Sequence, residues 1–417
     1  MYTVRELYST KCIFDGRNIQ HVWQNELVAW KKLTDNSSYP FPKLEISSKQ
    51  DATAQSIHDL NNPVICQDIS WSFDGTSFVT THSDNGIRQY LVPDDGEITS
   101  LVPFKRFFRP QSIISSRINP NYSLFGSNDS NVILVASKEL PIQLLSLSAD
   151  ADEHSSLFNY EVQNPENENF ETVYAIDYAS DRLFLAGSVR NKVSLYDISR
   201  KTPIWHARSI KKHCGKSPHR AIVSCFDQSM ESIQKTHRYM ATYKNDIFLL
   251  DMRSQNIQNL KCSFNSDDNP RGVIQILLSM NGHYMYVIKR NSSFIDILDV
   301  RNNCERVNRL ALPFTIIKQK FKACIDQTNG LSIGSPDGKL LQWTSNIIEF
   351  GGIPRSAVEE TGTDLAPSMV FQTSYNESRL NVISFNPDMP QMMCVSYSPD
   401  KFSEEQNTKS GIAIFEL

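Results

Sequence analysis

The sequence lacks the long apolar runs and the cysteine pairs that mark membrane proteins and metal-binding domains. No window approaches about eighteen consecutive apolar residues, so we expect no membrane-spanning helix. The N-terminal residues have no apolar core behind a basic start, and they therefore do not form a secretory signal. The eight cysteines are scattered without any Cys-x-x-Cys pair, which is typical of buried thiols in a reducing compartment. These absences predict an intracellular, soluble protein with no membrane partner.

Patterns of a catalytic or metal site are also missing. The chain has no glycine-rich phosphate loop followed by Lys and Ser or Thr. Gly330–Gly334 matches the Gly-x-Ser-x-Gly pattern of hydrolases, but it lies between two predicted turns, so we interpret Ser332 as an ordinary strand residue. One group of His and Cys residues has spacings that fit neither paired cysteines nor a zinc finger, which favours a polar loop: His206, His213, Cys214, His219 and Cys225. We therefore predict no enzyme activity, no cofactor, no metal and no small-molecule substrate.

Charge of neither sign predominates. The net charge is −4 and the isoelectric point is about 6.2, so the overall balance does not demand a nucleic-acid or membrane partner. A protein that is nearly neutral overall can still carry a local basic face, and that face is what matters for binding RNA.

What the sequence does contain is a repeated pattern of short strands, seen most clearly in Ile65–Pro93. Ile69, Trp71 and Phe73 alternate with polar residues, as in a strand with one buried face. Two turns rich in Asp, Asn and Gly then separate a second and a third strand, and Pro93 ends the third. Three such strands followed by a looser fourth make one blade of a β-propeller of the WD40 kind.

The pattern recurs along the chain. Third strands close near Leu91, Leu147, Ile198, Asp251, Val300, Trp343 and Phe415. We therefore predict an all-β fold, a seven-bladed WD40-type β-propeller spanning residues 61–417. The repeats are degenerate, since no Gly-His pair opens a unit and no Trp-Asp pair closes one.

Residues 1–60 carry no blade pattern and are predicted to be an N-terminal extension. Val22–Leu33 has the spacing of a short amphipathic helix. The sequence ends on a third strand, Ile412–Leu417, so the last blade lacks an outer strand. Because an unpaired strand edge is a liability, we expect the extension to supply that strand and close the ring. The candidates are Leu7–Phe14 and Phe41–Ile46.

Two long segments interrupt the pattern. Residues 149–171 are rich in Asp and Glu and contain no Lys or Arg, which predicts a solvated insertion. Residues 345–378 form a long connection, and its part Pro367–Gln372 is predicted to be the outer strand of the sixth blade.

One basic stretch, Arg200–Arg220, has no acidic residue and includes a tryptophan. Cations beside an aromatic ring suit RNA, because phosphates attract the charge and an unstacked base can lie on the ring. The predicted RNA-binding residues are Trp205, Arg208, Lys211, Lys212, His213, Lys216 and Arg220. The alternative is a solvated edge strand with Trp205 packed inside the blade. A weaker second candidate is the run Phe104–Arg109, whose aromatic residues fit packing better.

Several segments resemble the telomerase Cajal-body WD40 proteins. They are Trp71–Gly75 with Ser83–Pro93, which resemble that family's first blade, Ser137–Ile142, which resembles its second, and Asn381–Pro387, which resembles its last. The fungal branch of this resemblance is a divergent nuclear WD40 protein linked to pre-mRNA splicing and, genetically, to the enzyme that trimethylates small nuclear RNA caps. The likeness is strong in these blades and faint between them.

The resemblance implies a non-catalytic nuclear factor. It is expected to act as a monomer within a complex and to associate with small nuclear ribonucleoprotein proteins, small nuclear RNA or both. It would support pre-mRNA splicing by stabilising the particle at the 5′ splice site. Two alternatives stay open: a generic WD40 scaffold that binds peptides on the propeller rim, and a factor in small-RNA or telomerase RNA trafficking.

Overall fold

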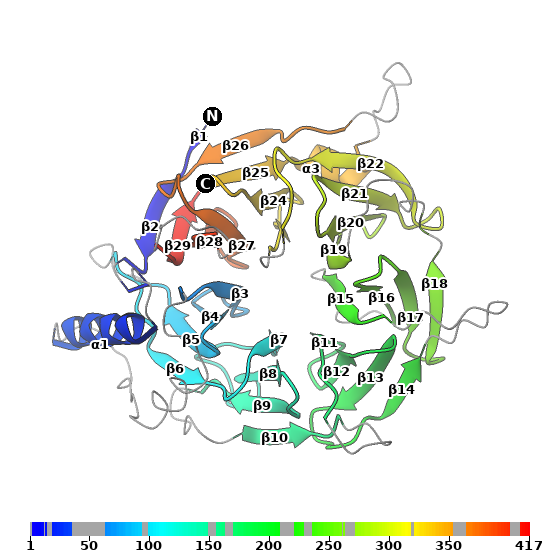
Figure 1. Cartoon of the computed structure of the whole chain (residues 1–417), viewed down its shortest axis with the longest axis horizontal. Coiled ribbons are helices and arrows are strands. Elements are labelled where there is room, and N and C mark those ends of the chain that lie inside the picture. Colours follow the sequence, from blue (N-terminus) through cyan, green and yellow to red (C-terminus); the bar gives the residue numbers. More distant parts are fainter. Residues whose placement is uncertain are drawn as a thin grey trace.

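The protein is described by a computed structural model that covers residues 2–11, 13–14, 19–35, 63–93, 99–148, 156–162, 170–208, 221–228, 236–260, 262, 272–317, 321–352, 364–400 and 409–417. These residues form small antiparallel sheets arranged as blades around one axis (Figure 1). The predicted all-β, seven-bladed propeller is therefore confirmed. Among the described residues no helix is long and apolar enough to cross a membrane.

Each blade has four strands, numbered outward from the axis. Blade 1 comprises β3 Cys66–Trp71, β4 Ser77–His82, β5 Gly86–Leu91 and β6 Lys105–Phe108. Blade 2 comprises β7 Ile113–Ile118, β8 Val132–Ser137, β9 Ile142–Ser146 and β10 Ser156–Tyr160. Blade 3 comprises β11 Ala175–Tyr178, β12 Leu183–Gly187, β13 Lys192–Asp197 and β14 Trp205–Arg208. Blade 4 comprises β15 Val223–Gln228, β16 His237–Thr242, β17 Ile247–Asp251 and β18 Asn256–Leu260.

Blades 5 to 7 continue in the same order. Blade 5 comprises β19 Val273–Leu278, β20 Tyr284–Lys289, β21 Phe294–Asp299 and β22 Glu305–Ala311. Blade 6 comprises β23 Cys324–Ile325, β24 Leu331–Gly334, β25 Lys339–Trp343 and β26 Met369–Gln372. Blade 7 comprises β27 Arg379–Phe385, β28 Met392–Ser398, β29 Gly411–Glu416 and the early strand β2 Arg5–Ser9. Blades 4 and 5 are joined by a short parallel pairing of their innermost strands, Asp227 opposite Ile276.

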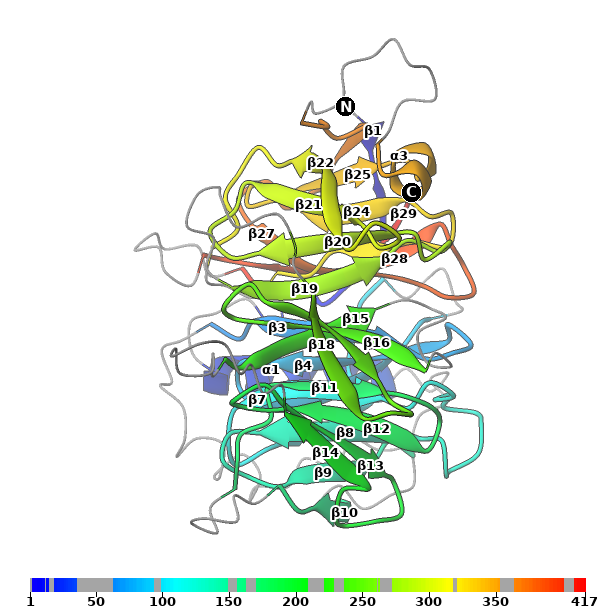
Figure 2. The same cartoon turned by 90° about the vertical axis from the view of Figure 1, so that its right-hand side faces the viewer.

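Apolar side chains fill the spaces between neighbouring blades. One cluster joins blades 1 and 7 and includes Trp71, Phe78, Tyr90, Cys394 and Ile414. Similar clusters join the other neighbouring blades, so the core is divided among the spaces between blades. Figure 2 shows the same blades from the side. The inner strand of every blade runs from one face of the ring to the other. We call the face on which inner strands begin the entry face, and the turns between second and third strands lie on it too.

The N-terminal segment closes the ring. β2 pairs antiparallel with β29, with Arg5 opposite Glu416 and Ser9 opposite Ala413. The preceding strand β1, Tyr2–Thr3, pairs in parallel with β26 of blade 6. The predicted closure by the extension is confirmed, and β2 overlaps the start of the candidate Leu7–Phe14. The other candidate, Phe41–Ile46, and the boundary at residue 60 lie outside the described residues.

The predicted helix is present as α1, Ile19–Asp35, which lies against the outside of blade 1 (Figure 1). Its buried Glu26 carboxylate accepts hydrogen bonds from the guanidinium groups of Arg88 and Arg106. Trp23 Nε1 donates to Asp84 Oδ2 at 3.3 Å, and Arg88 Nη2 donates to the same oxygen at 2.7 Å. A buried ion network therefore fixes α1 to blade 1. This network uses Arg106, so the run Phe104–Arg109 is packing rather than a second RNA surface.

Two predicted insertions contain regular structure. The segment 149–171 was expected to be a solvated loop, but residues 156–160 form β10, the outer strand of blade 2. Tyr160 is fully buried there, and its hydroxyl donates to the Ile198 carbonyl oxygen at 2.8 Å, which explains why this part is ordered. The connection 345–378 contains the helix α3, Ser345–Phe350, and the strand β26. The predicted outer strand Pro367–Gln372 is thus confirmed at Met369–Gln372.

Candidate functional site on the entry face

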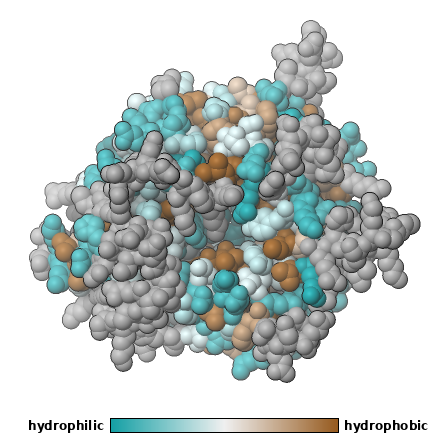
Figure 3. All heavy atoms as spheres, viewed as in Figure 1, coloured by the Kyte–Doolittle hydropathy of each residue, from teal (hydrophilic) through white to brown (hydrophobic). Residues whose placement is uncertain are grey.

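The inner strands enclose an axial pocket of about 400 Å³ that extends from the entry face, at Ser83 and Tyr243, along the channel to Arg117 of β7 and Gln228 of β15. Residues of blades 1 to 6 line it. In space-filling form the ring is hollowed at its centre (Figure 3). Three lining residues are cationic, Arg117, Arg290 and Lys322, and one, Asp68, is a carboxylate. The pocket therefore carries an excess of positive charge.

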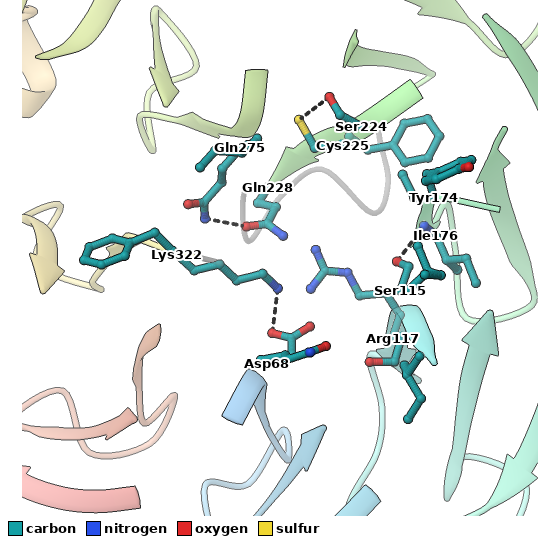
Figure 4. A pocket seen from close by; sticks show the side chains of 18 of the residues that line it. Asp68, Ser115, Arg117, Tyr174, Ile176, Ser224, Cys225, Gln228, Gln275 and Lys322 are labelled. Atoms are coloured by element: carbon teal, nitrogen blue, oxygen red, sulfur yellow. Dashed lines mark hydrogen bonds and ion pairs between the residues drawn. The ribbon is translucent and has the colours of Figure 1, made fainter. Parts of the chain in front are cut away.

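Two cations reach the middle of this pocket from different blades. Lys322 Nζ lies 2.6 Å from Asp68 Oδ1, and Arg117 Nε lies 3.2 Å from Asp177 Oδ1. The guanidinium of Arg117 and the ammonium of Lys322 point toward each other across the cavity (Figure 4). In the sequence, Lys318, Lys320 and Lys322 alternate with Ile317, Gln319 and Phe321, which is typical of the solvent face of a strand; Lys318 and Lys320 lie outside the described residues. That interpretation is wrong for Lys322, whose backbone lies against the inner strand of blade 7 and sends the side chain inward.

The charges around Lys322 oppose one another. Burial lowers the pKa of its ammonium, Asp68 raises it, and the nearby Arg117 guanidinium lowers it further, so that the pKa lies below its usual value. A positive group held beside another positive group is a place where an anion is favoured. The pocket is therefore suited to binding a negatively charged group between these two side chains.

Neutral polar groups complete the wall. Gln275 Nε2 donates to Gln228 Oε1 at 2.9 Å and to the Ala323 carbonyl oxygen at 2.8 Å. This bond orients the Gln228 amide so that its nitrogen points toward the cavity (Figure 4). Cys225 also lines the wall, but burial raises the pKa of its thiol to about 12, which leaves it protonated and unreactive. The wall thus offers hydrogen-bond donors, and its cysteine is not a reactive thiol.

Two tyrosines stand in the pocket wall on the entry face. Tyr174 directly precedes β11, and Tyr243 directly follows β16. The Arg290 guanidinium lies over the Tyr243 ring, 4.6 Å from its centroid, in a cation–π contact. Both tyrosines are partly exposed, so an aromatic surface lies beside the cationic centre of the pocket.

The turns around the pocket have a regular charge pattern. In blades 2 to 5 the residue before a positive-φ residue is a cation, and we call this set the basic arc: Lys138, Arg190, Lys244 and Arg290. The following residues, which have φ between 54° and 61°, are Glu139, Asn191, Asn245 and Asn291. Lys138, Arg190 and Lys244 are exposed, and Arg290 is partly exposed. Four successive blades therefore present a positive charge at one equivalent turn position.

The charge at this turn position changes sign between blades. In blades 1 and 6 the equivalent turn position holds an aspartate, Asp84 before Asn85 and Asp337 before Gly338. Asp84 is buried in the α1 network, whereas Asp337 is exposed and pairs with Lys339. Among the described turns of blades 1 to 6, this position thus holds a cation only in blades 2 to 5.

The predicted RNA-binding residues are placed only in part. Trp205 is 8% exposed and packs with Leu195, Phe226 and Met240 between blades 3 and 4, which favours the packing alternative for this residue. Arg208 ends β14, and the stretch that follows it, with Lys211, Lys212, His213, Lys216 and Arg220, lies outside the described residues.

The two residues that follow that stretch, Ala221 and Ile222, are hydrogen-bonded to turns of the basic arc. Ala221 N donates to Asn191 Oδ1 at 3.2 Å, and Asn191 N donates to the Ala221 carbonyl oxygen at 2.8 Å. Tyr243 N donates to the Ile222 carbonyl oxygen at 3.1 Å. The basic stretch therefore rejoins the described structure between the arc turns of blades 3 and 4.

Sequence reasoning missed the arc and the pocket cations. The arc had a detectable signal, since Lys138, Lys244 and Arg290 lie one or two residues after the second strand of their blades. Arg117 and Lys322 had none, because a charge directed into a channel is indistinguishable in sequence from one directed into solvent.

Catalytic and metal sites were also sought. Ser332 is buried inside β24, so the Gly-x-Ser-x-Gly match is a strand and not an exposed elbow. Within the described parts of the chain no three His, Cys, Asp or Glu side chains gather as metal ligands. Of the His and Cys group noted above, only His206 and Cys225 belong to those parts.

The chain was then compared with known proteins. No protein-family model matches it. Protein SWT21 of Zygosaccharomyces rouxii is 42% identical over 414 residues, which is 98% of this chain and 96% of that protein. Protein SWT21 of Kluyveromyces lactis is 39% identical over 408 residues, with 97% of each chain covered. Protein SWT21 of Saccharomyces cerevisiae strain JAY291 is 37% identical over 355 residues, covering 81% of this chain and 97% of that protein. Identity at this level over almost the whole length shows that the chain belongs to the SWT21 family of yeast proteins.

Proposed function

We propose that the protein is a non-catalytic nuclear factor that associates with small nuclear ribonucleoproteins and supports pre-mRNA splicing. It would do so by contacting small nuclear RNA on its entry face and stabilising the particle at the 5′ splice site. The observation that carries this proposal is the basic arc, four equivalent turns that each present a cation around an axial pocket.

The arc suits RNA for electrostatic reasons. Cations that neutralise phosphates release bound counterions, which supplies most of the sequence-independent binding free energy. The basic stretch is followed directly by Ala221, whose N–H donates to Asn191 Oδ1 beside Arg190 of the arc. Arg208, Lys211, Lys212, His213, Lys216 and Arg220 are therefore kept as proposed RNA contacts.

The sequence resemblance supports the same function. The segments that resemble the telomerase Cajal-body WD40 proteins form the first blade (Trp71–Gly75, Ser83–Pro93), the turn between β8 and β9 (Ser137–Ile142) and the inner strand of blade 7 (Asn381–Pro387). The second of these contains Lys138 of the arc. A propeller fold does not by itself define a function, so the nuclear setting and the splicing role rest on this resemblance.

The test is recovery of RNA from cells. The tagged protein replaces the native copy in yeast, and RNA that co-purifies with it is sequenced. We expect small nuclear RNAs with the wild type. The variant Lys138→Glu/Arg190→Glu/Lys244→Glu should lose them, since three contacts become repulsive.

A matched control changes three exposed cations outside the basic arc, Lys32→Glu/Arg182→Glu/Arg253→Glu. It alters net charge by the same amount and should retain the RNA. Equal recovery with both triple variants would remove the arc as the RNA surface. Recovery of telomerase RNA in place of spliceosomal RNAs would favour the trafficking role.

A second candidate function is a protein-interaction scaffold that binds peptides at the rim. The axial pocket favours it, since Arg117 and Lys322 could hold an acidic side chain. Nuclease treatment before purification separates the two: partners of a scaffold remain bound, whereas partners bridged by RNA are lost.

A further inference from the structure

The axial pocket contains hydrogen-bond donors that are not fully paired with its own residues. The Lys322 side chain is 19% exposed to the cavity, while its partner Asp68 is 8% exposed and covered. Nε of Arg117 is paired with the Asp177 carboxylate. Its two terminal nitrogens have no hydrogen-bond partner among the described residues. The Gln228 amide nitrogen points into the same space (Figure 4). Three groups of donors, from blades 2, 4 and 6, therefore converge where no acceptor of the described chain reaches them all.

We propose that the axial pocket binds one nucleotide of a single-stranded RNA. Its phosphate lies between Arg117 and Lys322, and its base lies against Tyr174. The inference rests on the RNA contact proposed above, and it adds a defined nucleotide site to a surface that otherwise attracts any polyanion.

The size and lining of the pocket favour a nucleotide. A volume of about 400 Å³ falls within the range of small-ligand sites, roughly 300 to 1,000 Å³. A guanidinium presents paired donors that match phosphate oxygens. Tyr174 lines the same cavity and is only partly buried, so one ring can stack on a base.

The surroundings favour RNA over an acidic protein segment. An acidic side chain would use Arg117 and Lys322 but would leave the aromatic surface of Tyr174 and Tyr243 without a role. A single strand uses both, and the basic arc beyond the mouth continues the path for neighbouring phosphates. The excess of two positive charges among the lining residues, three cations against Asp68, is also compatible with a phosphodiester, which brings one negative charge.

Asp68 makes the proposal specific. Its carboxylate already occupies one side of Lys322 and competes with an incoming phosphate. Replacing it by asparagine removes the competitor and keeps an oxygen for the Ile69 N–H, which donates to Asp68 Oδ1 at 3.0 Å. Phosphate affinity should therefore rise in this variant. A purely structural role for the Lys322–Asp68 pair predicts no such gain.

The test uses fluorescence anisotropy of the full chain with labelled octauridine. Uridine 5′-monophosphate and uridine, which lacks the phosphate, are unlabelled competitors. We expect the monophosphate to compete more strongly than the nucleoside for the wild type. Arg117→Gln and Lys322→Gln should each weaken octauridine binding about tenfold or more and abolish the difference between competitors. Tyr174→Ala should weaken binding by a similar factor.

Matched controls are Arg182→Gln and Lys32→Gln, exposed cations remote from the pocket, which should bind like the wild type. Circular dichroism and melting temperature identify any variant that fails to fold. If a variant fails to fold, the proposal is tested by Asp68→Asn, whose affinity for the monophosphate should rise. A loss of monophosphate affinity in Asp68→Asn, or equal competition by the two competitors for the wild type, overturns the proposal.

Binding of labelled octaglutamate tests the alternative that the pocket holds an acidic protein segment. If it binds in place of octauridine and is lost in Lys322→Gln, the pocket holds acidic protein segments and the nucleotide assignment is wrong. These measurements use purified protein, so their outcome is separate from the cellular function. Failure to recover small nuclear RNA from cells with an intact monophosphate site would remove the splicing role and leave the site.

Discussion

Glu26 is a carboxylate enclosed between two guanidinium groups, and none of the three side chains is more than 2% exposed. A buried ion pair contributes little compared with apolar packing, but removing one partner leaves an uncompensated charge in the interior. Here Arg88 keeps Asp84 as a partner, whereas Arg106 loses its ion pair with Glu26. Removing Glu26 therefore destabilises the fold more than the ion pairs of Glu26 stabilise it.

We predict that Glu26→Ala lowers the free energy of unfolding by about 3–5 kcal/mol. Urea denaturation followed by tryptophan fluorescence measures the change. Glu139→Ala, at a carboxylate that is 72% exposed, is the control and should change it by about 0.5 kcal/mol or less. A loss below about 1 kcal/mol in Glu26→Ala would show that the arginines find other partners.

His82 belongs to the same network and gives it a pH dependence. Its Nε2 lies 2.8 Å from Thr80 Oγ1, while its Nδ1 is buried with no partner in the described structure. Burial and the Arg88 charge lower the pKa of this imidazole well below 6.5, and Asp84 opposes them only in part. The folded protein therefore holds His82 neutral.

We expect this neutrality to destabilise the fold in mild acid. Below pH 6.5 the unfolded chain protonates His82 and the folded chain does not, so the free energy of unfolding falls as pH drops, by up to about 1.4 kcal/mol per unit. Denaturation at pH 7.5, 6.5 and 5.5 measures this slope. His82→Asn should have a shallower slope than the wild type, and identical slopes would assign the dependence to other groups.

At the scale of single elements, β2 is the short strand that completes blade 7 and closes the ring. It covers the edge of β29 with five residues and contributes Leu7 and Tyr8 to the cluster between blades 7 and 1. Tyr8 also donates its hydroxyl proton to the Pro93 carbonyl oxygen at 3.0 Å. Without it, blade 7 has a bare edge and blade 1 loses part of its support.

We predict that deleting residues 1–11 lowers the free energy of unfolding by roughly 3 kcal/mol or more, the value of burying two large apolar side chains. Calorimetry of the truncated chain measures the loss. A synthetic peptide of residues 2–11 added in excess should restore the melting temperature. If the truncated chain melts like the full chain, the strand contributes no closure.

Element patterns also explain how far the sequence could predict the fold. Inner strands alternate or are wholly apolar, and their turns contain Asn or Gly at positive φ, as at Asn85 and Gly282. Outer strands carry a weaker signal. β10 was missed because only Tyr160 among its residues is buried, and its acidic neighbours suggested a loop. The α1 network was missed because Glu26 and Arg88 are 62 positions apart, so each resembles a surface charge.

At the scale of the whole molecule, the pocket depends on the ring. Its lining comes from six blades, and Lys322 is held by a backbone hydrogen bond from its N–H to the Asn381 carbonyl oxygen of blade 7. No single blade can form this site. A ligand bound there therefore contacts the assembled propeller and not the unfolded chain.

We predict that octauridine at 100 times its dissociation constant raises the free energy of unfolding of the wild type by about 2.7 kcal/mol. The same concentration should stabilise Arg117→Gln much less. Urea titration with and without the oligonucleotide gives both values. The Arg117→Gln protein could instead be more stable without the oligonucleotide and gain as much stability from it as the wild type does. That result would place the binding outside the pocket.

The pairing of β2 with β29 also sets an order of assembly during translation. Arg5–Ser9 leave the ribosome before every strand of blades 1 to 6, and Gly411–Glu416 leave after them. Joining Tyr8 to Ile414 closes a loop of about 400 residues, which costs roughly 5 kcal/mol of chain entropy by the logarithmic law. In the nascent protein β2 must therefore stay unpaired with blade 7 until β29 has been synthesised. A ribosome that stops early releases a chain with an open edge, which chaperones and proteases can distinguish from a finished ring.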